Sequence, residues 1–220
     1  MIVDERITSY IHSLDQGNTQ LLTQIEREAR ADLVPIIRQE TASFLKVLLR
    51  MQRPKNILEV GTAVGFSALF MSEYAPADCR ITTIEKYEKR IPIARENFRR
   101  AGKEDVITLL EGDATEILHS LTGSYDLIFM DAAKGQYIHF LSDVLRLLAP
   151  GGVLLSDNVL QDGDIIESRF AVERRNRTIH SRMREYLYAL THTPGITTSV
   201  LPMGDGLTLT VKGEDYEQTT

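Results

Sequence analysis

The stretch Leu58-Glu-Val-Gly-Thr-Ala-Val-Gly-Phe-Ser67 decides the fold, because a short apolar run, Asn56–Val60, leads directly into a glycine-rich turn. Gly61 and Gly65 lack a Cβ, which lets the backbone lie close to a ligand. Their G-x-x-x-G spacing differs from the G-x-G-x-x-G of dinucleotide-binding loops, and the Lys-Ser/Thr pair of phosphate-binding loops is missing. The turn therefore predicts a ligand site at the end of a strand, but not a pyrophosphate site.

Four further apolar runs alternate with helix-like stretches after this turn. The runs are Arg80–Glu85, Val106–Leu110, Tyr125–Met130 and Gly152–Ser156, and the helix-like stretches include Lys89–Arg100 and Gln136–Leu148. Such alternation is typical of a parallel sheet with helices on both faces. Near the end, Ile196–Leu201 and Leu207–Val211 flank a Pro- and Gly-rich turn and predict an antiparallel hairpin. We therefore expect an α/β fold.

The 220 residues are expected to form one domain. Residues 1–33 would form N-terminal helices, broken near Gly17-Asn18, residues 34–212 the core, and residues 213–220 a polar tail. A further helix is expected over about Gln39–Met51, at the start of that core.

Composition excludes several classes of protein. Hydrophobic residues at 43% and charged residues at 25% are typical of a globular protein, and the net charge of −6 argues against a generally basic nucleic-acid binder. The single cysteine, Cys79, excludes a disulfide framework within the chain and a Cys-rich zinc site. Because no apolar stretch approaches the ~18 residues of a membrane span, we expect a soluble cytoplasmic protein without a membrane partner.

Acidic residues follow or close three consecutive strands. Glu59 lies two residues before Gly61, where a carboxylate suits a cationic group such as the amino group of a methionine moiety. Glu85 closes the second strand and can accept hydrogen bonds from both hydroxyls of a ribose. Asp113 and Ala114 follow the third strand, where an adenine edge would lie. Any one of these signals could be an ordinary tight turn, but three together favour a nucleoside-containing ligand.

The next two strands end in oxygen-bearing side chains. Asp131 follows the fourth strand, and Asp157 and Asn158 follow the fifth. Carboxylate and amide oxygens suit Mg²⁺ or Ca²⁺ rather than Zn²⁺. The alternative is that Asp131 caps a helix and Asp157-Asn158 forms a turn.

Taken together, these motifs resemble S-adenosylmethionine (SAM)-dependent methyltransferases over about residues 34–212, and most of all the cation-dependent O-methyltransferases that act on catechols and caffeoyl-CoA. The resemblance implies a Rossmann-like class I methyltransferase fold, with a seven-stranded, mostly parallel sheet ending in an antiparallel hairpin, and a homodimer. It implies SAM contacts at Ile37, Glu59, Gly61, Ser67, Glu85, Asp113, Ala114 and Asp131. It implies Mg²⁺, or another divalent cation, held by Asp131, Asp157 and Asn158.

Lys134 is the expected partner of Asp131 in catalysis. A lysine whose ammonium form is disfavoured by burial or by a nearby cation can act as a base. The resemblance implies that Lys134 takes or stabilises the proton of the acceptor hydroxyl, and a solvated helix lysine is the alternative. Tyr137 is expected on the same helix face, in contact with substrate.

Residues 169–184 carry six arginines and one acidic residue, which indicates an anionic partner. Arginine binds phosphate bidentately, so RNA phosphate contacts are expected from this group, although a solvated helix face with internal ion pairs would also account for it. The arginines expected to contact RNA are Arg169, Arg174, Arg175, Arg177 and Arg182.

Within the family, this arginine-rich stretch resembles bacterial tRNA 5-hydroxyuridine methyltransferases. That resemblance implies a tRNA anticodon stem-loop as partner and 5-methoxyuridine at the wobble position as product. Two alternatives remain open: a small-molecule enzyme acting on catechols or caffeoyl-CoA-like esters, and a non-catalytic SAM-binding regulatory module.

Overall fold

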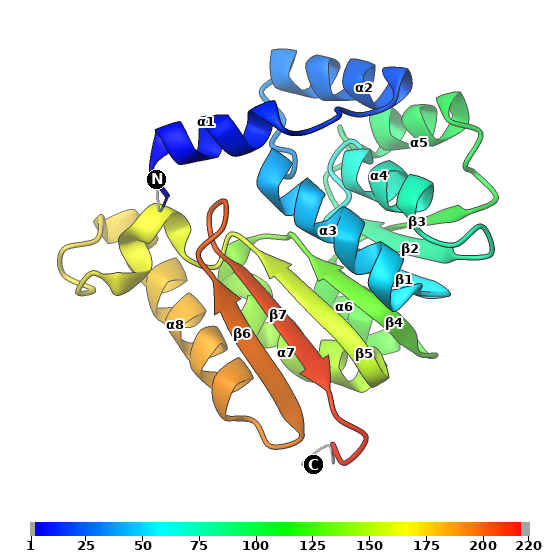
Figure 1. Cartoon of the computed structure of the whole chain (residues 1–220). Helices are drawn as coiled ribbons and strands as arrows, with labels where there is room; N and C mark the ends of the chain where they lie inside the picture. Colours follow the sequence, from blue (N-terminus) through cyan, green and yellow to red (C-terminus); the bar gives the residue numbers. More distant parts are fainter. Residues whose placement is uncertain (1–2, 217–220) are drawn as a thin grey trace.

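The structure of the protein is a computed structural model, which describes residues 3–216 (Figure 1). Its architecture follows from the strands, whose apolar side chains point alternately to the two faces of the sheet. The described residues form a seven-stranded sheet of order β3-β2-β1-β4-β5-β7-β6, in which only β7 pairs antiparallel to its neighbours. The strands are β1 (Asn56–Val60), β2 (Arg80–Glu85), β3 (Ile107–Glu111), β4 (Tyr125–Met130), β5 (Leu148–Asp157), β6 (Ile196–Leu201) and β7 (Leu207–Lys212). This topology is the predicted mostly parallel sheet with a C-terminal hairpin.

Helices cover both faces of the sheet, with α3, α4 and α5 on one side and α6 and α7 on the other (Figure 1). The α-helices are α1 (Glu5–Ser13), α2 (Gln20–Ala31), α3 (Gln39–Gln52), α4 (Phe66–Tyr74), α5 (Ile91–Arg100), α6 (Ala114–Ser120), α7 (Tyr137–Leu147) and α8 (Arg177–His192). Short 3₁₀ segments are η1 (Lys134–Gln136), η2 (Gln161–Ile166) and η3 (Arg174–Asn176). The predicted break between the first two helices falls at residues 14–19.

Two hydrophobic clusters lie on opposite faces of the sheet. Ile57 and Phe129 point into the cluster beneath α3 and α4, whereas their neighbours Leu58 and Ile128 point into the cluster beneath α7 and α8. Successive residues of one strand thus feed two different cores, which explains why the strands read as continuous apolar runs. The alternation leaves the strand ends, rather than the strand faces, free for function.

Some boundaries differ from those predicted. The fifth strand begins at Leu148, four residues before the predicted start, because Leu148 already pairs with Tyr125. Pairing resumes between Val153 and Leu127, and the intervening Pro-Gly-Gly turn is accommodated as a bulge in the strand. The helix predicted over Gln136–Leu148 divides into η1 and α7. Residues 1–2 and 217–220, which fall in the predicted N-terminal helices and polar tail, lie outside the described residues.

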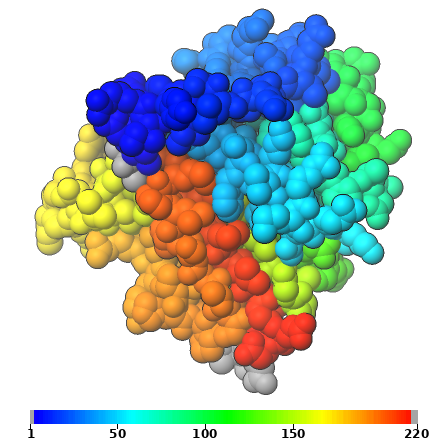
Figure 2. Space-filling model, in the orientation of Figure 1, coloured from blue at the N-terminus to red at the C-terminus, as the bar shows by residue number. Residues whose placement is uncertain are grey.

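The register of the parallel strands brings their carboxyl ends to one edge of the sheet. Met130 of β4 pairs with Ser156 of β5, so the residues that follow them, Asp131 and Asp157, emerge side by side. The helices α1 and α2 lie above this edge in Figure 1, and Figure 2 shows α1, in dark blue, passing beside α3 and the turn between β6 and β7. Over residues 3–216 the helices are too short or too polar to cross a bilayer.

Gly61 joins two of these strand ends tightly. It has φ +108°, and a Cβ at this position would overlap the backbone carbonyl of Asp131 and lie 2.9 Å from its carbonyl carbon. The Asp131 amide also donates to the carbonyl oxygen of Val60 at 3.0 Å. The first glycine of the turn therefore serves the close approach of β1 and β4, and not only the approach of a ligand.

Replacing Gly61 with alanine should destabilise the protein by about 2–4 kcal/mol, because the added methyl group meets backbone and the positive φ disfavours a side chain. Gly151→Ala is the matched control, since Gly151 has φ +72° but no atom within 4 Å of the added Cβ, so only backbone strain of about 1–2 kcal/mol applies. Urea unfolding of both variants measures the difference. Equal losses of stability would show that the contact with Asp131 is unimportant.

Candidate active site

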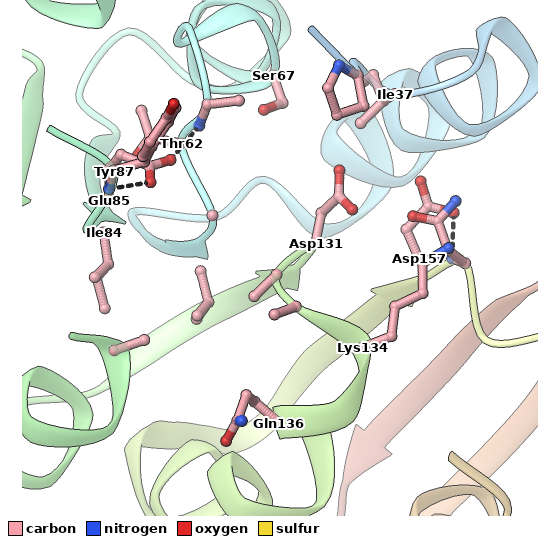
Figure 3. A pocket seen from close by; sticks show the side chains of 18 of the residues that line it. Ile37, Thr62, Ser67, Ile84, Glu85, Tyr87, Asp131, Lys134, Gln136 and Asp157 are labelled. Carbon is pink, nitrogen blue, oxygen red and sulfur yellow. Dashed lines mark hydrogen bonds between the residues drawn. The ribbon is translucent and has the colours of Figure 1, made fainter. Parts of the chain in front are cut away.

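A cavity of about 760 Å³ opens at the carboxyl ends of β1, β2, β4 and β5, a volume in the range of cofactor and small-molecule sites (Figure 3). Glu85 and Tyr87 lie at one end of it, Asp131, Lys134 and Asp157 at the other, and Ser67 and Ile37 lie along a third side. The cavity is lined by ten of the predicted site residues: Ile37, Gly61, Ser67, Glu85, Asp113, Ala114, Asp131, Lys134, Asp157 and Asn158.

Backbone amides fix the carboxylate of Glu85. One oxygen accepts hydrogen bonds from the amides of Lys86 (3.0 Å) and Tyr87 (2.8 Å), and the other accepts from the amide of Ala63 (2.8 Å). The side chain is thus held rigidly between the glycine-rich turn and the end of β2. Its remaining lone pairs face the cavity and can accept hydrogen bonds from hydroxyl groups of a ligand.

Asp113 has a structural task besides lining the cavity. Its carboxylate accepts a hydrogen bond from the Thr115 amide at 2.9 Å and so caps the N-terminus of α6. This hydrogen bond, together with an ion pair to Lys86, lowers the pKa of Asp113. Asp113 therefore both caps α6 and lines the cavity.

Glu59 corrects one prediction, because its side chain does not line the cavity. It is fully buried beneath α4, and its two oxygens accept hydrogen bonds from Ser67 Oγ and Thr83 Oγ1. Burial raises the pKa of Glu59 to about 8, although the hydrogen bonds from Ser67 and Thr83 oppose the rise. Any effect of Glu59 on a ligand must therefore pass through Ser67, which does line the cavity.

Asp131 and Asp157 face the same cavity from neighbouring strand ends. Asp157 is 1% exposed, and its Oδ1 accepts a hydrogen bond from the Asn158 amide at 2.8 Å. Burial raises the pKa of Asp131 and that of Asp157, and repulsion from Asp131 raises that of Asp157 further. Asn158 has φ +58°, a left-handed conformation that asparagine tolerates well. The pair of carboxylates is therefore an anionic site that lacks enough compensating charge.

These residues fit a divalent cation. Two carboxylates and an amide carbonyl are hard oxygen donors, and a bound dication would offset the burial of two negative charges. Within residues 3–216 no three His, Cys, Asp or Glu side chains gather in a metal-binding arrangement. A cation would therefore depend on Asn158 as its third protein ligand, which leaves coordination positions for water and substrate.

Lys134 forms an ion pair that the sequence does not reveal. Its Nζ lies 3.2 Å from Oδ2 of Asp205, in the turn between β6 and β7. The Lys134 side chain is 34% exposed, whereas that of Asp205 is only 5% exposed. Lys134 therefore reaches across the cavity wall, and it is not the freely solvated helix lysine of the alternative interpretation.

Tyr137 is wrongly predicted as a substrate contact. Its ring is fully buried, and its hydroxyl lies 3.1 Å from both the Met130 and the Asp157 carbonyl oxygens, which share its single proton. The residue starts α7 and turns inward, because the segment from Lys134 is a 3₁₀ turn rather than the first turn of an α-helix. Tyr137 thus ties the ends of β4 and β5 together beneath the site.

Two of the five predicted RNA-binding arginines bind backbone carbonyls, and none of the five lines the cavity. Arg177 donates to the carbonyls of Val172 and Phe170, and Arg182 donates to that of Gly135 at 3.1 Å. Arg184 similarly donates to the Ile165 carbonyl. These hydrogen bonds give Arg177 and Arg182 a structural task, since Arg177 holds the segment before α8 and Arg182 holds η1, and their contact with RNA phosphate stays a prediction. Arg169, Arg174 and Arg175 are exposed, and Arg175 pairs with Glu173.

Some cavity residues were missed by sequence reasoning. Tyr87 and Arg90 lie beside Glu85, with the guanidinium carbon of Arg90 5.3 Å from the centroid of the Tyr87 ring. Asp162 and Asp205 line the opposite end. Position after a strand end could have identified Tyr87, but Asp205 lies in a turn whose Gly-Asp-Gly composition indicates only a hairpin.

The sheet order, the glycine-rich turn after β1 and the acidic end of β2 define a class I methyltransferase. A model of the O-methyltransferase family matches residues 12–213 of this chain. The chain belongs to this family and is a SAM-dependent O-methyltransferase of the catechol and caffeoyl-CoA type.

Individual relatives agree with this assignment. The catechol O-methyltransferase of Niastella koreensis is 32% identical over 169 residues, covering 74% of this chain and 76% of the relative. Caffeoyl-CoA O-methyltransferase 1 of Eucalyptus globulus is 33% identical over 180 residues, covering 77% and 72%. The SAH-bound methyltransferase of Podospora anserina has the same fold, with a TM-score of 0.86, 28% identity, and coverage of 96% of this chain and 95% of that one.

The buried carboxyl of Glu59 should make the metal-free protein less stable as the pH rises. Because its folded pKa of about 8 lies above the ordinary value of 4.5, stability is fully present below pH 4.5 and is lost progressively up to about pH 8. Glu59→Gln cannot ionise, so it should avoid roughly 2–4 kcal/mol of that loss. Urea unfolding at pH 5 and pH 8 measures the two slopes.

Glu116→Gln, a change at an exposed residue of α6, provides the control and should follow the wild type. If Glu59→Gln and the wild type lost equal stability between the two pH values, the raised pKa of Glu59 would be disproved.

Proposed function

We propose that this protein transfers the methyl group of SAM to one of two adjacent oxygen atoms of its acceptor, with the help of a divalent cation. The observation that carries the proposal is the pair of desolvated carboxylates, Asp131 and Asp157, facing one cavity next to Asn158 and Lys134. An acceptor with vicinal oxygens is the ligand that such a cation site suits, because it chelates a dication with hard donors.

The donor would lie along the carboxyl ends of β1 and β2. Glu85 would accept hydrogen bonds from the ribose hydroxyls, and Asp113 and Ala114 would border the adenine ring. Ser67, held by Glu59, would bind the methionine moiety together with Gly61 and the Ile37 segment. This assignment uses the full length of the cavity and leaves the end near Asp131 and Asp157 for the acceptor.

Asp131, Asp157 and Asn158 would hold Mg²⁺ or another divalent cation, which when bound stabilises negative charge developing on the acceptor oxygen. Lys134 would interact with the hydroxyl that loses its proton. Its ion pair with Asp205 places the Lys134 ammonium group at the acceptor end of the cavity, where it would stabilise the oxyanion. Placing acceptor and donor in one cavity supplies the remaining advantage through proximity.

The acceptor favoured by the relatives is a small molecule of the catechol or caffeoyl ester type. The curated relatives named above act, by their names, on catechol and caffeoyl-CoA. The wall near the cation site also carries Arg38, 3.2 Å from Asp162, which would suit an acceptor with an anionic substituent.

A second candidate acceptor, 5-hydroxyuridine at the tRNA wobble position, is favoured by one surface. Phe170 and Ile166 are 83% and 82% exposed in the segment between β5 and α8, which also carries the exposed Arg169 and Arg174. The Arg177 guanidinium carbon lies 5.9 Å from the Phe170 ring centroid. An exposed aromatic ring among arginines suits unstacked bases and phosphates, and Figure 2 shows this segment, in yellow, protruding from the molecule.

Methyl transfer from labelled SAM should be measured to catechol, to caffeoyl-CoA and to tRNA lacking the wobble methyl group, each with Mg²⁺ and with excess chelator. We expect transfer to a catechol-type acceptor that the chelator abolishes and that Asp157→Asn lowers at least about 100-fold. Transfer to tRNA alone, weakened by Arg169→Ala and Arg174→Ala together, would establish the second candidate. Binding of SAM without transfer to any acceptor would support a non-catalytic SAM-binding module. Transfer that the chelator does not affect would refute the requirement for a divalent cation.

We further propose a homodimer formed through the N-terminal helices. Helix α1 buries none of its residues, and its exposed apolar side chains are those of Ile7, Tyr10 and Ile11. Such a face gains stability when a second copy covers it. Sedimentation should therefore show a dimer that Ile7→Glu with Ile11→Glu converts to a monomer, whereas a monomeric wild-type protein would contradict this assembly.

A further inference from the structure

The buried carboxylate of Asp205 has no role in the reaction as described so far. It lies in the turn between β6 and β7, lines the same cavity as Asp131 and Asp157, and is 5% exposed. A charge so deeply placed is costly unless it is paired, so its partners indicate what it does.

Both oxygens of Asp205 are engaged. Oδ2 lies 3.2 Å from Nζ of Lys134, and Oδ1 accepts a hydrogen bond from the amide of Asp162. Among the described residues, Asp205 does not combine with Asp131 and Asp157 into a metal-binding group. Asp205 is therefore not a third carboxylate ligand, and its charge is directed at Lys134.

The backbone around Asp205 holds its side chain in place. The carbonyl oxygen of Asp205 accepts from the Leu160 amide, and that of Gly206 accepts from the Val159 amide, each at 3.0 Å. These bonds fasten the β6–β7 turn to the residues that directly follow Asn158. The anchor for Lys134 is thus rigidly connected to the strand end that carries Asp157.

The backbone of Lys134 is held independently from the other side. Arg182 of α8 donates to the carbonyl oxygen of Gly135 at 3.1 Å and fixes the η1 segment. The backbone of Lys134 is thus fixed by α8, and its ammonium group interacts with the carboxylates of Asp205, Asp131 and Asp157. It pairs with Asp205, while its charge also lowers the pKa values of Asp131 and Asp157.

We propose that Asp205 is a positioning residue that holds the Lys134 ammonium beside the acceptor site and away from the carboxylates of Asp131 and Asp157. Without Asp205, the ammonium would pair with those carboxylates, compete with the divalent cation and leave the acceptor oxygen. This inference rests on the cation site and on the role of Lys134 in the proposed function.

The first test is calorimetric titration of the metal-free protein with MgCl₂, which requires no acceptor. Asp205→Asn keeps an oxygen for the Asp162 amide but loses the charge, and we expect it to weaken Mg²⁺ binding roughly three- to tenfold. In the Lys134→Ala background the same change should have less than about a twofold effect, because Asp205 acts through Lys134. An equal effect in both backgrounds, or none in either, would overturn the proposal.

The second test is turnover with the acceptor identified in the transfer assay. Asp205→Asn should lower kcat about 10- to 100-fold, with the donor dissociation constant within twofold of wild type. The double variant with Lys134→Ala should be no slower than Lys134→Ala alone, whereas multiplied effects would contradict the inference. Asp205→Glu keeps the charge and should retain more activity and tighter Mg²⁺ binding than Asp205→Asn. If Asp205→Asn fails to fold, Asp205→Glu is the variant whose Mg²⁺ binding and turnover are compared with the wild type.

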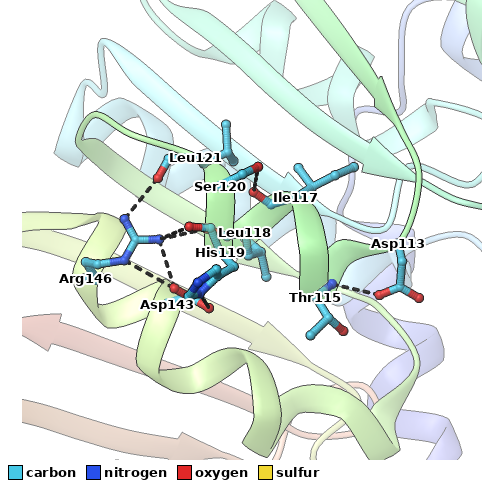
Figure 4. A network of polar contacts seen from close by, with 9 residues as sticks. All are labelled: Asp113, Thr115, Ile117, Leu118, His119, Ser120, Leu121, Asp143 and Arg146. Carbon is cyan, nitrogen blue, oxygen red and sulfur yellow. Dashed lines mark hydrogen bonds and ion pairs between the residues drawn. The ribbon is translucent and has the colours of Figure 1, made fainter. Parts of the chain in front are cut away.

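The matched control is Asp143→Asn, which removes a carboxylate from an ion pair remote from the cavity. Asp143 Oδ1 lies 2.9 Å from Nη2 of Arg146, which also donates to backbone carbonyls at the end of α6 (Figure 4). We expect this variant to bind Mg²⁺ and turn over as the wild type does. A wild-type protein that binds no Mg²⁺ would refute the proposed function itself, whereas normal wild-type binding with unchanged Asp205→Asn would refute only the role of Asp205.

Discussion

The placement of two carboxylates at adjoining strand ends, away from bulk water, is the constraint on which the rest of the site depends. The β4–β5 register, with Met130 opposite Ser156, brings Asp131 and Asp157 together. Burial raises the pKa of both carboxyls, and repulsion from Asp131 raises that of Asp157 further, so the arrangement costs stability in the metal-free protein. Such a cost is typical of a functional site and has no benefit for folding alone.

The surrounding structure holds Asp131 and Asp157 rigidly in place and does not let them move apart. Tyr137 bridges the backbone carbonyls at the ends of both strands, and Gly61 permits the glycine-rich turn to lie against the carbonyl of Asp131. The glycine-rich turn and the acidic pair are therefore rigidly connected. Because in-line methyl transfer requires donor and acceptor at a fixed separation, a rigid connection between these segments is what the reaction needs.

Sequence reasoning located the strands and the cavity residues at their ends, because both depend on local patterns of apolar, glycine and acidic residues. It failed where side-chain direction or long-range contact decides. Glu59 shares the strand face of Ile57 and so points beneath α4, which strict alternation along β1 could have indicated. Asp205 is 71 residues from Lys134, and no local pattern connects them. The carbonyl partners of Arg177 and Arg182 were equally invisible, since composition reports charge but not the direction of a guanidinium group.

In the proposed function, the chemistry and the choice of acceptor would depend on different segments of this chain. Strand ends supply Asp131, Asp157 and Glu85, whose positions follow from the sheet, and any acceptor with vicinal oxygens would meet the same pair of carboxylates, Asp131 and Asp157. The segment between β5 and α8 lies outside the sheet and is fastened by inward-directed arginines, Arg177 and Arg182, while Phe170 faces solvent. Changes in this segment can alter what binds without disturbing the strand ends. Family membership therefore establishes methyl transfer, whereas the acceptor would be selected by a segment that lies outside the sheet.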